Sequence, residues 1–109
     1  MIRKKKRKAP ARQGAAETRR DDKGIAWRKT EVETAIIAIV ADRNQSTARG
    51  ISRSTQFGRD LGWDDWYKLT LVKPVKRQLH VTLSHTMVKN DVKSVGNLAD
   101  YTWSLMEGI

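Results

Sequence analysis

The residues best suited to chemistry in this sequence are two adjacent carboxylates, Asp64 and Asp65, which stand just before an apolar pattern of helical spacing. Such acids ordinarily cap a helix, because they accept hydrogen bonds from free backbone N–H groups and interact favourably with the positive end of the helix dipole. The chain has no nucleophile–base pair of recognisable spacing and no glycine-rich phosphate loop. We therefore expect no catalytic residue and no enzymatic activity.

Metal and cofactor chemistry has equally little support. Neither His80 nor His85 has a Cys, His or carboxylate partner at the spacing of metal ligands, so we interpret both as solvated. The chain has no cysteine, which suits a reducing compartment, and no apolar run near the roughly 20 residues of a membrane span. The N-terminus also lacks the apolar segment of a secretory signal. We expect no metal, no cofactor, no membrane span and a cytoplasmic location.

A helix expected over residues 66–79 would position the two carboxylates. Its apolar residues recur at steps of three and four and would share one face; they are Trp66, Leu69, Val72, Val75 and Leu79. Pro74 lies inside this pattern, and a proline in a helix interior removes a hydrogen bond. We therefore expect either a kink at Pro74 or two short helices.

The polar positions of this helix carry only basic charge. They are Lys68, Lys73, Lys76 and Arg77. A basic helix face is a candidate docking surface for an acidic protein partner. Trp63, in the preceding loop, joins this candidate surface because an exposed aromatic ring beside lysines can anchor a protein interface or stack on a base. Trp66 and Trp103 are expected to pack in the core.

Two further main helices and one short one are expected. Residues 30–43 have an acidic first turn and an apolar stripe at helical spacing; a strand over residues 35–40 is the alternative, because Ile and Val favour strands. The last helix begins after the cap residue Ser94, and Leu105 ends its stripe. Between them, Val81 and Leu83 predict either a short strand or an extended connector that fills the core, and residues 86–90 predict one helical turn.

The formal net charge of +10 is concentrated at the N-terminus. Residues 1–30 hold 12 Lys or Arg against 3 acids, whereas residues 31–109 hold 10 against 9. The densest basic run is Arg3, Lys4, Lys5, Lys6, Arg7 and Lys8. A block of like charge with little to bury predicts a disordered tail over residues 1–29, able to contact phosphates of nucleic acid or of an anionic membrane surface. A targeting address and a solubilising leader are the alternatives.

The order and spacing of these patterns carry a resemblance to a known family. From about Thr30 to Met106 the chain resembles acyl carrier proteins, small four-helix domains that carry acyl groups on a phosphopantetheine arm. The matching features are the first apolar stripe, Ile51 six residues before Phe57, the run Phe57-x-x-Asp60-Leu61-Gly62-x-Asp64, the pattern Leu79-x-Val81-x-Leu83, and the segment from Val92 to Tyr101.

The departures from this family concern its function. In the family an Asp-Ser-Leu motif supplies the serine that takes the phosphopantetheine; here Asp64, Asp65 and Trp66 occupy those positions. Because Asp65 has no hydroxyl, the resemblance implies that the arm is absent. Asp65 is then a second acid in a first helical turn, a natural mimic of a phosphorylated serine, or an engineered change. The family's second helix is also acidic, whereas this one is basic, which would repel the family's usual partners.

These observations predict an all-α, small acyl-carrier-like four-helix bundle over residues 30–109, with three main helices, one short helix and the disordered basic tail. The predicted function is a binding module that has lost the carrier chemistry and docks on an acidic partner, with no small-molecule substrate. Two alternatives stay open: a nucleic-acid-associated protein anchored by its tail, and an atypical acyl carrier in lipid or polyketide biosynthesis.

Overall fold

Helix α2, Lys29–Arg43, is the longest element of the computed structural model, which describes residues 18–108. Its buried apolar positions are those of the predicted stripe: Val32, Ile36, Ile39 and Val40. The carboxylate of Glu31 accepts a hydrogen bond from the Arg28 N–H at 2.8 Å and so fixes the first turn. The predicted helix is confirmed, and the alternative strand over residues 35–40 is wrong.

The second helical stretch consists of three consecutive pieces. Helix α3 spans Asp65–Lys68, the 3₁₀ turn η2 spans Leu69–Leu71, and helix α4 spans Val72–Leu79. The predicted break therefore occurs, but upstream of Pro74. Pro74 is the third residue of α4, within the first turn, where a backbone N–H has no partner within the helix.

The last two helices are short and capped by serines. Helix α5 spans His85–Asn90 and α6 spans Val95–Ser104; the hydroxyl oxygens of Ser84 and Ser94 accept hydrogen bonds from the N–H groups of Met87 and Asn97. The predicted cap at Ser94 is confirmed. Leu105 is 42% exposed, contrary to prediction, because α6 ends one residue earlier.

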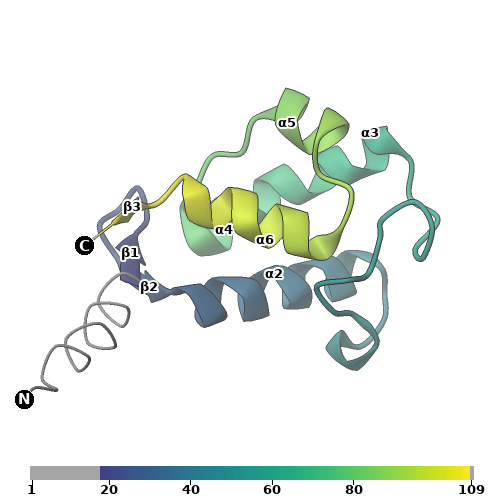
Figure 1. Ribbon diagram of the computed structural model, residues 1–109, viewed down its shortest axis with the longest axis horizontal. Helices are drawn as coiled ribbons and strands as arrows, with labels where there is room; N and C mark the ends of the chain where they lie inside the picture. Colours follow the sequence, from purple (N-terminus) through teal and green to yellow (C-terminus); the bar gives the residue numbers. More distant parts are fainter. Residues whose placement is uncertain (1–17, 109) are drawn as a thin grey trace, which may run out of the picture.

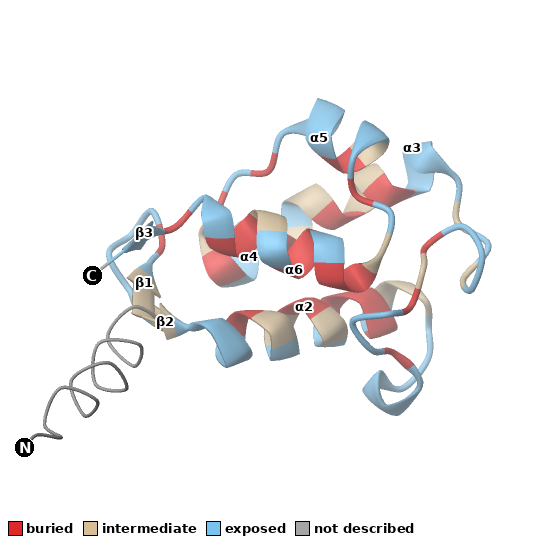
Figure 2. Cartoon of the chain, in the orientation of Figure 1, coloured by how far each residue is buried: buried red, intermediate tan, exposed pale blue. Residues whose placement is uncertain are grey.

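The core lies between α2, α4 and α6 (Figures 1 and 2). Val81 and Leu83 are buried in an extended connector between α4 and α5 that forms no strand, so the connector interpretation is confirmed. Trp103 is also buried, as predicted. No helix within residues 18–108 is long and apolar enough to cross a bilayer.

A three-stranded antiparallel sheet at one end of the helices overturns the all-α prediction (Figure 1). Strands β1, Thr18–Arg20, and β2, Ala26–Arg28, form a hairpin, and β3, Glu107–Gly108, pairs with the other edge of β1. The fold is mixed α and β. Residues 18–28, which we expected in the disordered tail, are ordered because β1 finds partners on both sides. The basic run from Arg3 to Lys8 lies outside the described residues.

Asp21 organises the hairpin turn. Its carboxylate accepts hydrogen bonds from the N–H groups of Lys23 at 2.9 Å and Ile25 at 3.0 Å, and from Nε1 of Trp27 at 2.8 Å. The turn also needs Gly24, whose φ of 83° is strained for other residues. Burial alone would raise the pKa of Asp21, but the hydrogen bonds from Trp27, Ile25 and Lys23 and the charge of His80 outweigh it and lower the pKa.

The loop between α2 and α3 contains the 3₁₀ turn η1, Ala48–Gly50, and is held by Arg53. The guanidinium of Arg53 pairs with the carboxylates of Glu33 on α2 and Asp100 on α6, the latter at 2.8 Å. The N–H of Gly96 donates to the Arg53 carbonyl at 2.9 Å, and a Cβ at this glycine would lie 3.0 Å from the same oxygen. The hydrogen bond from Arg53 lowers the pKa of Asp100. Arg53 therefore links the loop to both helices.

Replacing Asp21 by Asn should lower the free energy of unfolding at pH 7 by about 1–2 kcal/mol. The amide oxygen can accept from the N–H groups of Lys23 and Ile25, but the NH2 group would then face Nε1–H of Trp27 and cannot accept its hydrogen bond. Since the folded-state pKa of Asp21 is lowered, its stabilisation is present above the unfolded-state pKa and is lost as the pH falls through the folded-state pKa. Urea unfolding between pH 7 and pH 2 should therefore show a smaller acid-induced loss in the variant. Asp22→Asn, at an exposed neighbour, is the control; equal effects of the two changes would contradict the assignment.

Candidate functional site

The two carboxylates at the predicted site have different roles. Asp64 is the N-cap of α3, and its Oδ1 accepts a hydrogen bond from the Tyr67 N–H at 2.7 Å, which confirms the capping interpretation. Asp65 is the first residue of α3; its half-exposed side chain lies 3.1 Å from Nζ of Lys68. The hydrogen bond and the charge of Lys68 lower the pKa of Asp65. Asp65 is thus an ionised carboxylate held at the helix start.

Lys68 is buried and does not belong to the predicted docking surface. The residue is 2% exposed, and its Nζ donates hydrogen bonds to the carbonyl of Val92 at 2.6 Å and of Lys89 at 3.1 Å. With the Asp65 carboxylate, its three N–H donors have three oxygen partners. The ammonium group therefore joins α3 to the end of α5 and to the start of the connection to α6.

The burial of Lys68 corrects the predicted apolar face of this stretch. The side that faces the core reads Lys68, Leu71, Val75 and Leu79, whereas Leu69 and Val72 are only partly buried and Trp66 is 67% exposed. The 3₁₀ turn at residues 69–71 changes the helical phase between α3 and α4. The sequence prediction placed only apolar residues on the inner face of α3. It therefore put Trp66 there instead of Lys68.

Trp63 and Trp66 have exchanged their predicted environments. Trp63 is partly buried: it stacks on Phe57 with ring centroids 5.4 Å apart, meets the edge of Tyr67, and donates from Nε1 to Asn44 at 3.2 Å. Trp66, predicted in the core, instead lies at the surface with Nζ of Lys89 4.0 Å from its ring centroid. Trp63 therefore offers little surface to a partner, whereas Trp66 offers much.

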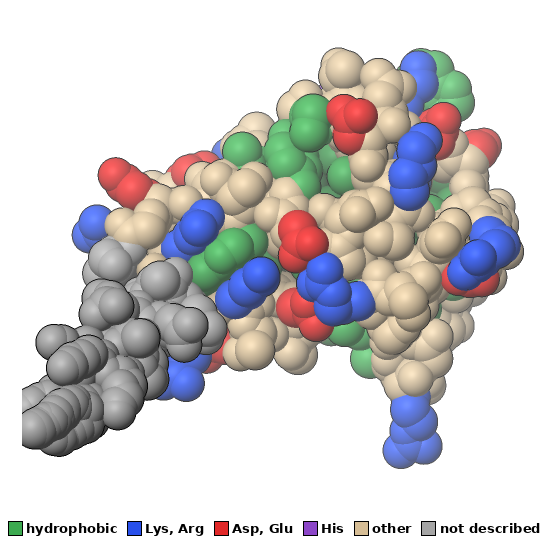
Figure 3. All heavy atoms as spheres, in the orientation of Figure 1, with side chains coloured by type: hydrophobic (Ala, Val, Ile, Leu, Met, Phe, Trp, Pro, Cys, Tyr) green, Lys and Arg blue, Asp and Glu red, His purple; other side chains and the backbone are tan. Residues whose placement is uncertain are grey.

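The remaining basic residues of the predicted surface, Lys73, Lys76 and Arg77, are exposed on α4. None of the three forms an ion pair with another residue in the described range 18–108. On the face seen in Figure 3, by contrast, several Lys and Arg side chains stand beside acidic ones. Helix α4 is thus a local concentration of positive charge, and we name Lys73, Lys76 and Arg77 the α4 basic face.

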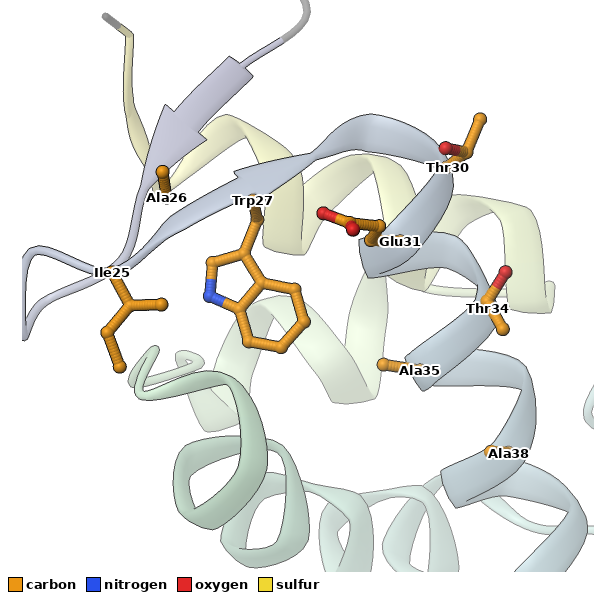
Figure 4. Close-up of a pocket in the computed structure, with 8 residues that line it drawn as sticks. All are labelled: Ile25, Ala26, Trp27, Thr30, Glu31, Thr34, Ala35 and Ala38. Atoms are coloured by element: carbon orange, nitrogen blue, oxygen red, sulfur yellow. The ribbon is translucent and has the colours of Figure 1, made fainter.

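A hollow of about 500 Å³ lies between β2 and α2 (Figure 4). Its walls come mainly from Ile25, Trp27, Ala35 and Ala38, with Glu31 at one side. The sequence did not predict this hollow, because Ile25 and Trp27 were expected in the tail rather than in a hairpin beside a helix. The hollow is open and largely apolar, and it contains no pair of groups suited to catalysis.

The described residues 18–108 contain no group of three or more acidic or histidine side chains that could hold a metal ion. No protein-family model matches the chain, and no curated protein matches it in sequence. The candidate site is therefore defined by its own geometry: a capped helix start at Asp64 and Asp65, and the α4 basic face on the same stretch of chain.

Replacing Lys68 by Met, which keeps an unbranched side chain but removes the ammonium group, should lower the free energy of unfolding by about 2–4 kcal/mol. The change leaves the carbonyls of Val92 and Lys89 without their donor inside the protein. Urea unfolding followed by circular dichroism measures the loss. The matched control, Lys73→Met on the exposed side of α4, should change stability by less than about 0.5 kcal/mol. Similar losses in both variants would show that the hydrogen bonds of Lys68 are not stabilising.

Proposed function

We propose that this protein is a non-enzymatic binding domain that docks on an acidic protein partner through the α4 basic face. One observation carries the proposal: Lys73, Lys76 and Arg77 are exposed on one short helix that contains no acid and makes no ion pair within residues 18–108. Exposed charge of one sign on a rigid element accelerates encounter with a partner of opposite sign and disfavours partners of like sign.

The charge on α4 is local rather than a property of the whole described surface. Residues 18–108 hold 15 Lys or Arg and 11 Asp or Glu, a modest excess for this length. Some of these charges are neutralised in pairs, notably Arg53 with Glu33 and Asp100, and Arg59 with Asp60. Helix α4 differs in its charge density, because Lys73, Lys76 and Arg77 lie within five residues with no acid among them. A partner's carboxylates can bind there without breaking an existing ion pair.

The resemblance to acyl carrier proteins supports a docking role for this stretch of chain. The helices between Lys29 and Ser104 are α2, α3, α4, α5 and α6, and Asp65, to which the resemblance assigns the carrier position, is the first residue of α3. Its carboxylate cannot form the phosphodiester of a phosphopantetheine arm and is engaged by Lys68. We propose that the chain retains a carrier-like docking helix with inverted charge and without the arm. A cytoplasmic location accords with the absence of cysteine.

Charge reversal on α4 tests this function in the full chain. Lys73→Glu, Lys76→Glu and Arg77→Glu combined should weaken binding to a partner at least a hundredfold, because three attractive charges become repulsive. The partner would be identified by photo-crosslinking from exposed Gln78 on α4 and then titrated in purified form. Circular dichroism should show that the triple variant keeps its helices.

The matched control reverses three tail charges: Lys4→Glu, Lys5→Glu and Lys6→Glu. This variant has the same net charge as the α4 triple variant, so a difference between them reports position rather than total charge. We expect it to weaken partner binding less than fivefold. If the tail variant loses all binding while the α4 variant keeps it, the proposed docking surface is wrong.

Nucleic-acid attachment is the second candidate function, and the six basic residues from Arg3 to Lys8 favour it. A salt titration of binding to duplex DNA and to RNA separates it from protein docking. A tail anchored to phosphates should give a steep loss of affinity with salt that the tail triple variant makes shallower by about three counterions. No binding by the unmodified chain at moderate salt would exclude this candidate.

The atypical-carrier alternative makes a prediction about intact mass. Incubation with coenzyme A and a phosphopantetheinyl transferase should add no mass to the chain, because Asp65 offers no hydroxyl to the enzyme. An ordinary acyl carrier protein in the same reaction is the positive control. An adduct on this chain would contradict the loss of carrier chemistry, and peptide mapping would then locate the residue that replaces the serine.

A further inference from the structure

The turn of the β1–β2 hairpin and the C-terminal end of α4 meet around a small depression. The N–H of Asp22 donates a hydrogen bond to the carbonyl of His80 at 3.1 Å, which fixes the two elements together. The depression has a volume of about 360 Å³ and is lined by Asp22, Lys23, Lys76, Arg77 and His80. It thus brings together cations from two parts of the chain that the sequence separates by more than fifty residues.

The charged side chains that line this depression are mostly basic, and the basic ones are not neutralised by ion pairs within residues 18–108. Lys23, Lys76 and Arg77 form no ion pair with any residue in the range 18–108, and Asp22 is the one acid in the lining. The neighbouring carboxylate of Asp21 is occupied by its three hydrogen bonds in the hairpin turn. Nζ of Lys76 donates to the hydroxyl of Thr82 at 2.9 Å, which holds one cation in place without neutralising it.

His80 lies in this lining because of an unusual backbone conformation. It is the C-cap of α4, with φ 55° and ψ 41°, in the left-handed region where glycine is the common residue. Its N–H donates to the Lys76 carbonyl at 3.0 Å and so closes the helix. A non-glycine residue in this region is strained, and the His80 side chain is carried into the wall of the depression.

We propose that this depression binds a phosphate monoester, a terminal phosphoryl group with two negative charges. Three cations supply more positive charge than a single carboxylate needs, and the His80 imidazole adds a hydrogen-bonding group to the lining. A guanidinium matches phosphate oxygens with paired donors. The lining comes from one turn and one helix end, which suits a single phosphoryl group rather than a track of backbone phosphates. The inference rests on the proposed function, since it names the chemistry of the partner: an acidic protein that carries a phosphorylated side chain.

Titration of the full chain with inorganic phosphate tests the pocket directly. At pH 7 and constant ionic strength, the ring resonances of His80 and the backbone amide resonances of Lys23 and Arg77 should shift and saturate together.

Arg77→Gln and Lys23→Gln should each weaken phosphate binding at least fivefold. Lys93→Gln is the matched control, because Lys93 is exposed and does not line the depression; it should change affinity less than twofold. His80→Asn, which tolerates the left-handed conformation, should weaken binding two- to fivefold without unfolding α4.

Further ligands distinguish the source of the phosphoryl group. Phenyl phosphate represents a small-molecule ester, and an acidic phosphoserine peptide is compared with the same peptide carrying serine. We expect the phosphopeptide to bind at least tenfold more tightly than the serine peptide and than phenyl phosphate. Tighter binding of phenyl phosphate would overturn the protein partner, and binding of a 12-base-pair DNA duplex without any response to free phosphate would overturn the pocket in favour of a polyanion surface.

Two results separate this inference from the proposed function. No saturable shift with phosphate, or equal weakening by Lys93→Gln and Arg77→Gln, overturns the phosphoryl pocket even if the α4 triple variant abolishes partner binding. Conversely, saturable phosphate binding that depends on Lys23 and Arg77 supports the pocket. If the α4 triple variant nevertheless still binds its partner, the proposed docking function is wrong while the phosphate pocket stands.

Discussion

The buried ammonium group of Lys68 is the interaction on which the arrangement of the helices depends. A lysine side chain loses much solvation when it is 2% exposed. It is stable there because its three N–H groups are directed at the Val92 and Lys89 carbonyls and the Asp65 carboxylate. Through these contacts one residue fixes the start of α3 against the end of α5. The direction in which α4 continues, and so the orientation of its basic face, follows from that fixed start.

The other end of the domain depends on a second saturated charge. Asp21 closes the β1–β2 hairpin, and the hairpin in turn places Asp22 and Lys23 against the end of α4. Lys68 and Asp21 therefore set the two ends of the same helical stretch, whereas the exposed cations between them keep their charge free. The charged groups of Lys68 and Asp21, which hold the fold together, have hydrogen-bond partners inside the protein. The proposed binding residues of α4 form no ion pair within residues 18–108.

The helices could be predicted from the sequence because their periodic signals are local. The stripe of α2, the caps at Asp64 and Ser94 and the connector through Val81 and Leu83 all rest on neighbouring residues. The sheet could not be found this way, since β1 is a three-residue strand in a basic segment and pairs with residues at the other end of the chain. Lys68 and Trp66 were misplaced for a related reason: a residue's type gives its average preference, and only the tertiary contacts show that these two reverse it.

The pairing of β1 with β3 also has a consequence for how the protein folds during synthesis. Arg19 pairs with Gly108, so the two residues are separated by almost the whole described chain. The hairpin of β1 and β2 can form early from local contacts, but the other edge of β1 must wait until the last strand has left the ribosome. Until then an unpaired strand edge is open to other chains, and its shortness limits that risk. The small size of this sheet is therefore a safeguard as well as a minor part of the architecture.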